Sequence, residues 1–111
     1  MVQYSPNFDL SFAALADPTR RGVLERLGQR DTSITELAET FGMTLTGIKK
    51  HVAILEQAGL VETEKVGRVR VCRLGTRRLD DETAWIGMYQ QMLEARLNRL
   101  EAFLERTKGT L

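Results

Sequence analysis

Apolar residues recur every three or four positions through the first half of the chain, which is the spacing of amphipathic helices. The pattern predicts four helices, over residues 8–16, over residues 18–28, between Ser33 and Gly42, and between Thr44 and Gly59. Gly42 and Gly59 suit the left-handed conformation that ends many helices. A short helix, a glycine-containing turn and a second helix make a helix-turn-helix, which the sequence places at 33–59.

Polar residues stand where three of these helices should begin. Asp17 precedes Pro18, and an N-cap followed by proline is a common helix start. Ser33 is followed three residues later by Glu36, which is the spacing of a capping box. Thr44 is a candidate N-cap of the fourth helix. These residues therefore mark the predicted starts of three helices.

After Gly59 the pattern changes from helical to alternating. Residues 60–74 read LVETEKVGRVRVCRL, which predicts two strands joined by a turn near Gly67. We assign this β-hairpin, or wing, to residues 60–75. Its tip carries Lys65 and Arg68.

The last segment predicts a long helix over residues 79–107, of about eight turns. Its apolar stripe consists of Ile86, Tyr89, Leu93, Leu97, Leu100 and Leu104, widened by Trp85, Met88, Met92 and Phe103. This stripe is broader than a small winged domain can cover, so we predict that a second copy of the chain covers it. The alternative is a helix folded back on its own domain.

Composition describes an ordinary globular chain of one domain, spanning 1–111, with 42% hydrophobic and 28% charged residues. The formal net charge is only +1, but residues 44–78 hold eight Lys and Arg against three Asp and Glu. The segments on either side each carry four basic and six acidic residues. A cationic middle between acidic flanks favours a polyanionic partner; the alternative is a solvated basic surface.

Targeting features are absent from the sequence. No apolar run approaches the length that spans a bilayer, and residues 1–6 carry no secretory signal. The single cysteine, Cys72, cannot form an internal disulfide, which fits a reducing compartment. We expect a cytoplasmic protein without a membrane partner.

The predicted fourth helix has a cationic side and an apolar side. Thr46, Lys49, Lys50 and Ala53 share one side. The opposite side consists of Ile48, Val52 and Leu55. Lysine can donate to guanine N7 and O6, and threonine can donate or accept, so the cationic side is predicted to enter a DNA groove.

Further candidate DNA contacts flank this side. Leu45 could meet a thymine methyl group, while Thr44 could bind a phosphate or act only as an N-cap. On the wing, Lys65, Arg68 and Arg70 are candidates for phosphate contacts that weaken with salt. The acidic residues Glu62 and Glu64 are expected to dilute this charge.

Arg20 and Arg21 leave two interpretations open. They could reach a phosphate, or they could form surface ion pairs with Asp17 or Glu25. The sequence does not separate these two interpretations.

Three stretches together resemble the ArsR/SmtB family of bacterial winged-helix repressors. They are ALADPTRRGVLERL at 14–27, ITELAETFGMTLTGIKKHVAILEQAGLV at 34–61, and GRVRVCRL at 67–74. The resemblance implies a mainly helical winged helix-turn-helix with about five helices. It also implies a DNA-backbone contact by His51; the alternative is a packed or hydrogen-bonded histidine.

The same resemblance implies a homodimer built from the first and last helices, with each recognition helix in a major groove of double-stranded DNA. The predicted dimer residues are Phe12, Trp85, Tyr89, Leu93, Leu97, Leu100 and Leu104.

The chain also departs from the family pattern. Leu45 replaces a frequent glutamine and Lys49 a frequent serine, so we expect an unusual base preference. Metal-sensing members carry cysteines on the third helix and His, Asp or Glu clusters on the last. Here the third helix has no cysteine and the last has no histidine, so no metal or other cofactor is predicted. Cys72 could be a thiol switch, although a strand position favours simple packing.

We therefore predict a sequence-specific transcriptional regulator, a homodimeric repressor that binds an inverted repeat. The alternative is a winged-helix interaction module without tight DNA binding. An enzyme is not expected, because one histidine, one cysteine and no glycine-rich phosphate loop offer no catalytic set. The operator and the inducing signal are not encoded in any motif.

Overall fold

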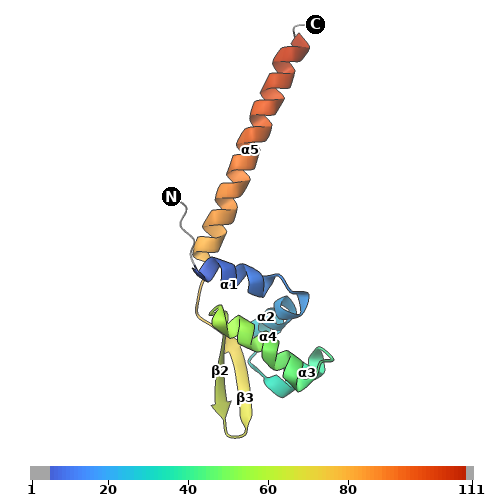
Figure 1. Cartoon of the computed structure of the whole chain (residues 1–111), viewed down its shortest axis with the longest axis vertical. Coiled ribbons are helices and arrows are strands. Elements are labelled where there is room, and N and C mark those ends of the chain that lie inside the picture. The colour runs from blue at the N-terminus through green and yellow to red at the C-terminus, as the bar shows by residue number, and fades with distance from the viewer. Residues whose placement is uncertain (1–5, 110–111) are drawn as a thin grey trace. The chain divides into compact units, whose positions relative to one another are not determined.

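The computed structural model describes residues 6–109, which form two compact units that divide after Arg77 (Figure 1). The described part of the first unit runs in the order α1 (Pro6–Leu15), α2 (Pro18–Gln29), β1 (Thr32–Ser33), α3 (Ile34–Thr40), α4 (Leu45–Gln57), β2 (Val61–Val66) and β3 (Val69–Leu74). The second unit contains α5 (Asp80–Gly109). The predicted winged helix-turn-helix with five helices is confirmed. The assignment of all 111 residues to one domain stays a prediction.

The predicted helix starts are confirmed by their hydrogen bonds. The side chains of Asp17, Ser33 and Thr44 each accept from the backbone N–H three residues later, at 3.0, 3.1 and 3.1 Å. Gly42 and Gly59 have φ angles of +61° and +76°, which an L side chain rarely adopts. The turn before α4 and the exit from it are therefore set by local chemistry.

The wing supplies two strands, β2 and β3, of a three-stranded antiparallel sheet with the order β1-β3-β2. In Figure 1 the β2–β3 hairpin projects from the helices of the first unit. The two-residue strand β1 pairs Thr32 with Cys72 and Ser33 with Val71, and sequence analysis missed it. It is too short to show alternation, and Ser33 also caps α3. This pairing attaches the base of the wing to the start of the helix-turn-helix.

The core of the first unit lies between α2, α3, α4 and the base of the sheet. Its largest fully buried apolar side chains are Val23, Leu37, Ile48, Val52, Leu55 and Cys72. Three of these belong to α4, and they are the predicted apolar side of that helix. Because burial anchors one side of α4, its opposite side is presented outward.

The chain after the wing passes very close to the end of α4. The N–H of Gly75 donates to the carbonyl of Leu60 at 2.9 Å, and a Cβ added at Gly75 would lie 2.5 Å from the carbonyl oxygen of Gly59. We expect Gly75→Ala to lower the free energy of unfolding by about 1–3 kcal/mol, because backbone atoms would have to move apart.

Urea denaturation measures this effect, with Gly28→Ala as the matched control. A Cβ at Gly28 meets only the end of the Leu74 side chain, at 4.0 Å. In a helix, alanine in place of glycine should leave stability unchanged or raise it by up to about 1 kcal/mol. Equal midpoints for the two variants would contradict the close approach.

Helix α5 carries an apolar stripe that is exposed along its length. Acidic residues occupy its first turn and Arg106 and Lys108 its last, as a helix dipole favours. The exposed apolar side chains are Trp85, Ile86, Met88, Tyr89, Met92, Leu93, Leu97, Leu100, Phe103 and Leu104, which are 43–57% accessible. Trp85 and Tyr89 stack with ring centroids 6.0 Å apart. The stripe predicted from periodicity is thus present as an exposed surface.

Candidate nucleic-acid interface

The side of α4 opposite the core is exposed and carries the predicted polar and cationic residues. Thr46, Lys49, Lys50 and Ala53 are all exposed. Leu45, the first residue of the helix, is 43% accessible although it is apolar. These side chains come from the N-terminal half of the helix, which is the half that reaches base edges in helix-turn-helix complexes.

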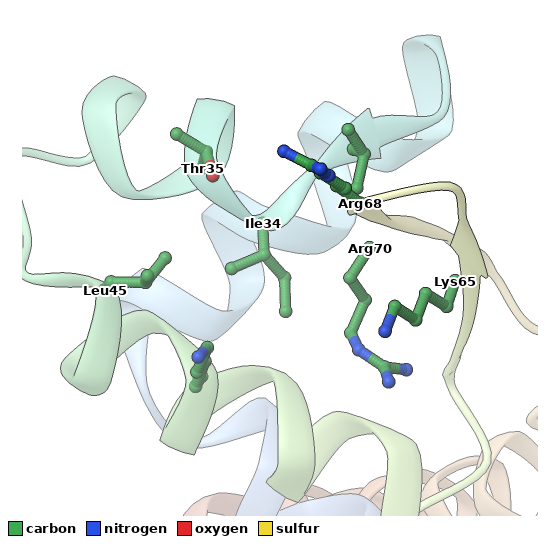
Figure 2. A pocket seen from close by; sticks show the side chains of 8 residues that line it. Ile34, Thr35, Leu45, Lys65, Arg68 and Arg70 are labelled. Atoms are coloured by element: carbon green, nitrogen blue, oxygen red, sulfur yellow. The ribbon is translucent and has the colours of Figure 1, made fainter.

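A cationic groove of about 310 Å³ lies between this helix and the wing. It is lined by Ile34, Thr35, Leu45, Lys49, Lys65, Arg68, Val69 and Arg70. Figure 2 shows Lys65, Arg68 and Arg70 on the wing side and Leu45 at the start of α4. Four positively charged side chains thus converge on one groove, which suits a polyanion.

The register of the wing separates its charges onto two faces. Lys65 pairs directly with Arg70, so both project from the same face of the hairpin. Glu62 and Glu64 alternate with Lys65 and belong to the other face. There Arg73 donates to Glu64 at 2.8 Å, and this hydrogen bond raises the pKa of Arg73. The two acids therefore lie on the face of the wing away from the groove, which a count of charges does not reveal.

A chain of hydrogen bonds attaches the wing to α4. Arg70 Nη1 donates to the hydroxyl of Thr63 at 3.0 Å, and that hydroxyl donates to a carboxylate oxygen of Glu56 at 3.0 Å. Glu56 lies near the end of α4. The Thr63 hydroxyl therefore joins the wing to the helix, and Arg70 supports that hydroxyl in addition to lining the groove.

The structure gives Arg20 and Arg21 partners that neither interpretation named, and a phosphate contact of these residues stays a prediction. Arg20 donates from Nε to the carbonyl of Ala14 and from Nη2 to that of Ala13, both at 2.9 Å. Arg21 donates from Nη1 to the carbonyl of Leu15 at 2.7 Å. The last carbonyls of a helix lack helical partners, and the two guanidinium groups satisfy them. These arginines thus cap α1, and within residues 6–109 neither guanidinium forms a salt bridge with Asp17 or Glu25.

His51 is hydrogen-bonded, which agrees with the prediction of a packed or hydrogen-bonded histidine. Its Nδ1 lies 3.1 Å from Arg20 Nη1 and 3.9 Å from a carboxylate oxygen of Asp17. A fifth of its side chain is accessible. The backbone N–H of Arg20, with help from the positive charge of the Arg20 guanidinium, lowers the pKa of Asp17. The DNA-backbone contact of His51 stays a prediction.

Comparison with known proteins places this chain in one family. A model described as a helix-turn-helix domain matches residues 15–64. The transcriptional repressor SdpR of Bacillus subtilis is 33% identical over 75 residues, which are 68% of this chain and 83% of SdpR. The crystal structure of the ArsR family transcriptional regulator RHA00566 is 40% identical with a TM-score of 0.74, covering 85% of this chain and 97% of that one. The chain belongs to the ArsR family.

A further solved structure of similar fold is that of Mb0332 from Mycobacterium bovis. Its NMR structure is of a homodimeric winged helix-turn-helix DNA-binding domain, with 23% identity and a TM-score of 0.61, covering 87% of this chain and 94% of that one. At this identity the likeness supports the fold alone. ArsR proteins are transcriptional regulators and not enzymes, so this chain is a regulator with a helix-turn-helix DNA-binding domain.

Two features bear on what an ArsR protein of this sequence could sense. Among the described residues 6–109, no three His, Cys, Asp or Glu side chains gather as a metal site would require. Cys72 is fully buried in β3, and burial raises the pKa of its thiol to about 11. Because the thiolate is the reactive form, Cys72 remains an unreactive neutral thiol near pH 7, which supports the packing interpretation.

The described residues contain no helix that is both long and apolar enough to cross a membrane.

Proposed function

We propose that this ArsR-family regulator is a homodimeric repressor that binds an inverted repeat in double-stranded DNA. The observation that carries the proposal is the exposed side of α4, with its lysines next to a groove lined by four cations. An amphipathic helix held by its apolar side, with a basic hairpin beside it, matches the dimensions and charge of a major groove and its adjacent phosphates.

The chemistry of α4 suits base reading. Lys49 and Lys50 can donate to guanine N7 and O6, and Thr46 can donate or accept. Leu45 offers an exposed apolar group to a thymine methyl. The hydroxyl oxygen of Thr44 already accepts from the N–H of Gly47, so its remaining capacity as a donor suits a phosphate. Thr44 would thus serve as both cap and contact.

The wing and its groove suit the sugar-phosphate backbone. Lys65, Arg68 and Arg70 carry the charge, and the hydrogen bonds through Thr63 to Glu56 hold the hairpin against α4. Each neutralised phosphate releases counterions, so affinity should fall steeply as salt rises. The wing adds affinity, whereas α4 supplies sequence preference.

Self-association is supported by exposed apolar surface. The stripe on α5 and the residues Leu10 and Phe12 on α1 are accessible to a second copy. A homodimer is described for Mb0332, and SdpR is a repressor. Two copies related by a two-fold axis would present two α4 helices, which requires an inverted repeat.

Selection of bound oligonucleotides from a random double-stranded pool tests this function. We expect an enriched inverted repeat whose half-sites are about 10–10.5 base pairs apart, or a multiple of that spacing. A single half-site would contradict the dimer. The absence of any enriched sequence would contradict DNA recognition and favour the interaction-module alternative.

A further inference from the structure

The side chain of Arg20 joins three helices of the first unit. Two of its nitrogens donate to the last carbonyls of α1, at Ala13 and Ala14, and the third lies 3.1 Å from Nδ1 of His51 on α4. These two bonds to backbone carbonyls at the end of α1 hold the plane of the guanidinium in place. The remaining nitrogen is thereby aimed at the recognition helix.

This bond determines where the histidine carries its proton. A guanidinium has only N–H donors and stays protonated, so Nδ1 of His51 must be the acceptor. An imidazole that accepts at Nδ1 is neutral and carries its hydrogen on Nε2. A doubly protonated ring would present an N–H and a positive charge to the guanidinium instead.

A competing arrangement would place the proton on Nδ1 and direct it to Asp17. The nearest carboxylate oxygen is 3.9 Å from Nδ1, beyond hydrogen-bond distance, whereas Arg20 Nη1 is at 3.1 Å. The same carboxylate oxygen accepts from the backbone N–H of Arg20 at 3.0 Å, a true hydrogen-bond distance. The geometry therefore favours Arg20 as the partner.

The other ring nitrogen of His51 is available to a ligand. Within residues 6–109, Nε2 bonds to no group and is not enclosed by the protein. His51 lies on the flank of α4 that faces α2, while Lys49 lies on the flank that lines the groove. The DNA-facing side of α4 therefore has a cationic flank and a flank that carries His51.

We propose that Arg20 is a positioning residue for DNA binding, which holds His51 neutral with its proton on Nε2 as a donor to a phosphate. The phosphate contact rests on the proposed function, whereas the position of the proton is a property of the free protein. Arg20 also makes the end of α1 part of the same network.

The position of the proton can be measured directly, because His51 is the one histidine of the chain. Two-bond ¹H–¹⁵N spectra of the DNA-free protein at mildly alkaline pH should show a bare Nδ1 and a protonated Nε2. Arg20→Lys should shift the Nδ1 signal, since one ammonium group cannot reach both carbonyls and the ring. A proton on Nδ1, or an Nδ1 signal unchanged in Arg20→Lys, would overturn the proposal.

Two substitutions at His51 then separate its two nitrogens. Asparagine can keep an acceptor near the Nδ1 position but has no donor at Nε2, whereas glutamine can place an amide donor near Nε2 but loses the Nδ1 acceptor. We expect His51→Asn to melt near the wild-type temperature but to bind the selected DNA roughly tenfold more weakly or worse. His51→Gln should melt lower and bind DNA more tightly than His51→Asn.

If DNA affinity falls equally in both variants and follows their melting temperatures, His51 has only a packing role. That result would overturn the proposal. If the wild-type protein binds no DNA, the proposed function fails. The NMR measurement then still decides, without DNA, whether Arg20 sets the proton on His51.

Discussion

Lys49→Ala combined with Lys50→Ala is expected to abolish binding to the selected DNA site while the protein stays folded. Both side chains are exposed on α4, and the core residues of that helix are untouched. A good contact between a lysine and a base contributes about 1–3 kcal/mol of discrimination, so losing two should weaken binding roughly hundredfold or more. Gel-shift titration measures the affinity, and a thermal melt measures the fold.

The matched control removes the same charge from another part of the chain. Arg106→Ala with Lys108→Ala also deletes two cations, from the last turn of α5. If general electrostatic attraction were the whole cause, the control would lose as much affinity as the α4 variant. We expect the control to bind almost normally. Normal binding by the α4 variant would refute the assignment of α4 as the recognition helix.

Leu93→Glu combined with Leu97→Glu is expected to produce monomers and to weaken DNA binding at the same time. Both leucines are about half accessible in the apolar stripe of α5. Burying a carboxylate in an apolar seam without a partner is strongly unfavourable, so the seam should open. A protomer without its partner presents only one α4 helix to the DNA. It therefore contacts a single half-site, to which it binds weakly. Sedimentation and gel-shift titration report the two effects.

The control places the same two carboxylates on the polar side of α5. Gln91→Glu with Asn98→Glu adds equal charge to the same helix, and both residues are exposed outside the stripe. This variant should remain dimeric. If the leucine variant dimerises over the same range of protein concentration as the wild type, α5 is not the dimer seam.

Local chemistry made much of the first unit predictable. N-caps and left-handed glycines act on atoms within a few residues, so Asp17, Ser33, Thr44 and Gly59 could be recognised one by one. The spacing of apolar residues likewise identified the buried side of α4. The cationic residues opposite it followed from the same periodicity.

Other features depend on which segments meet in space. The β1 strand has no pattern of its own and exists because β3 lies beside it. The separation of Glu64 from Lys65 and Arg70 follows from strand register, which a charge count ignores. The register therefore places Lys65 and Arg70 together on a basic face of the wing.

Periodicity and short-range hydrogen bonds were enough to predict the helices, their caps, the polar side of α4 and the apolar stripe of α5. The contacts of Arg20 with the end of α1 and with His51, which is 31 positions away in the chain, depend instead on how the helices pack. A long side chain can reach many partners, and packing selects among them. The direction of such a side chain is therefore a property of the fold.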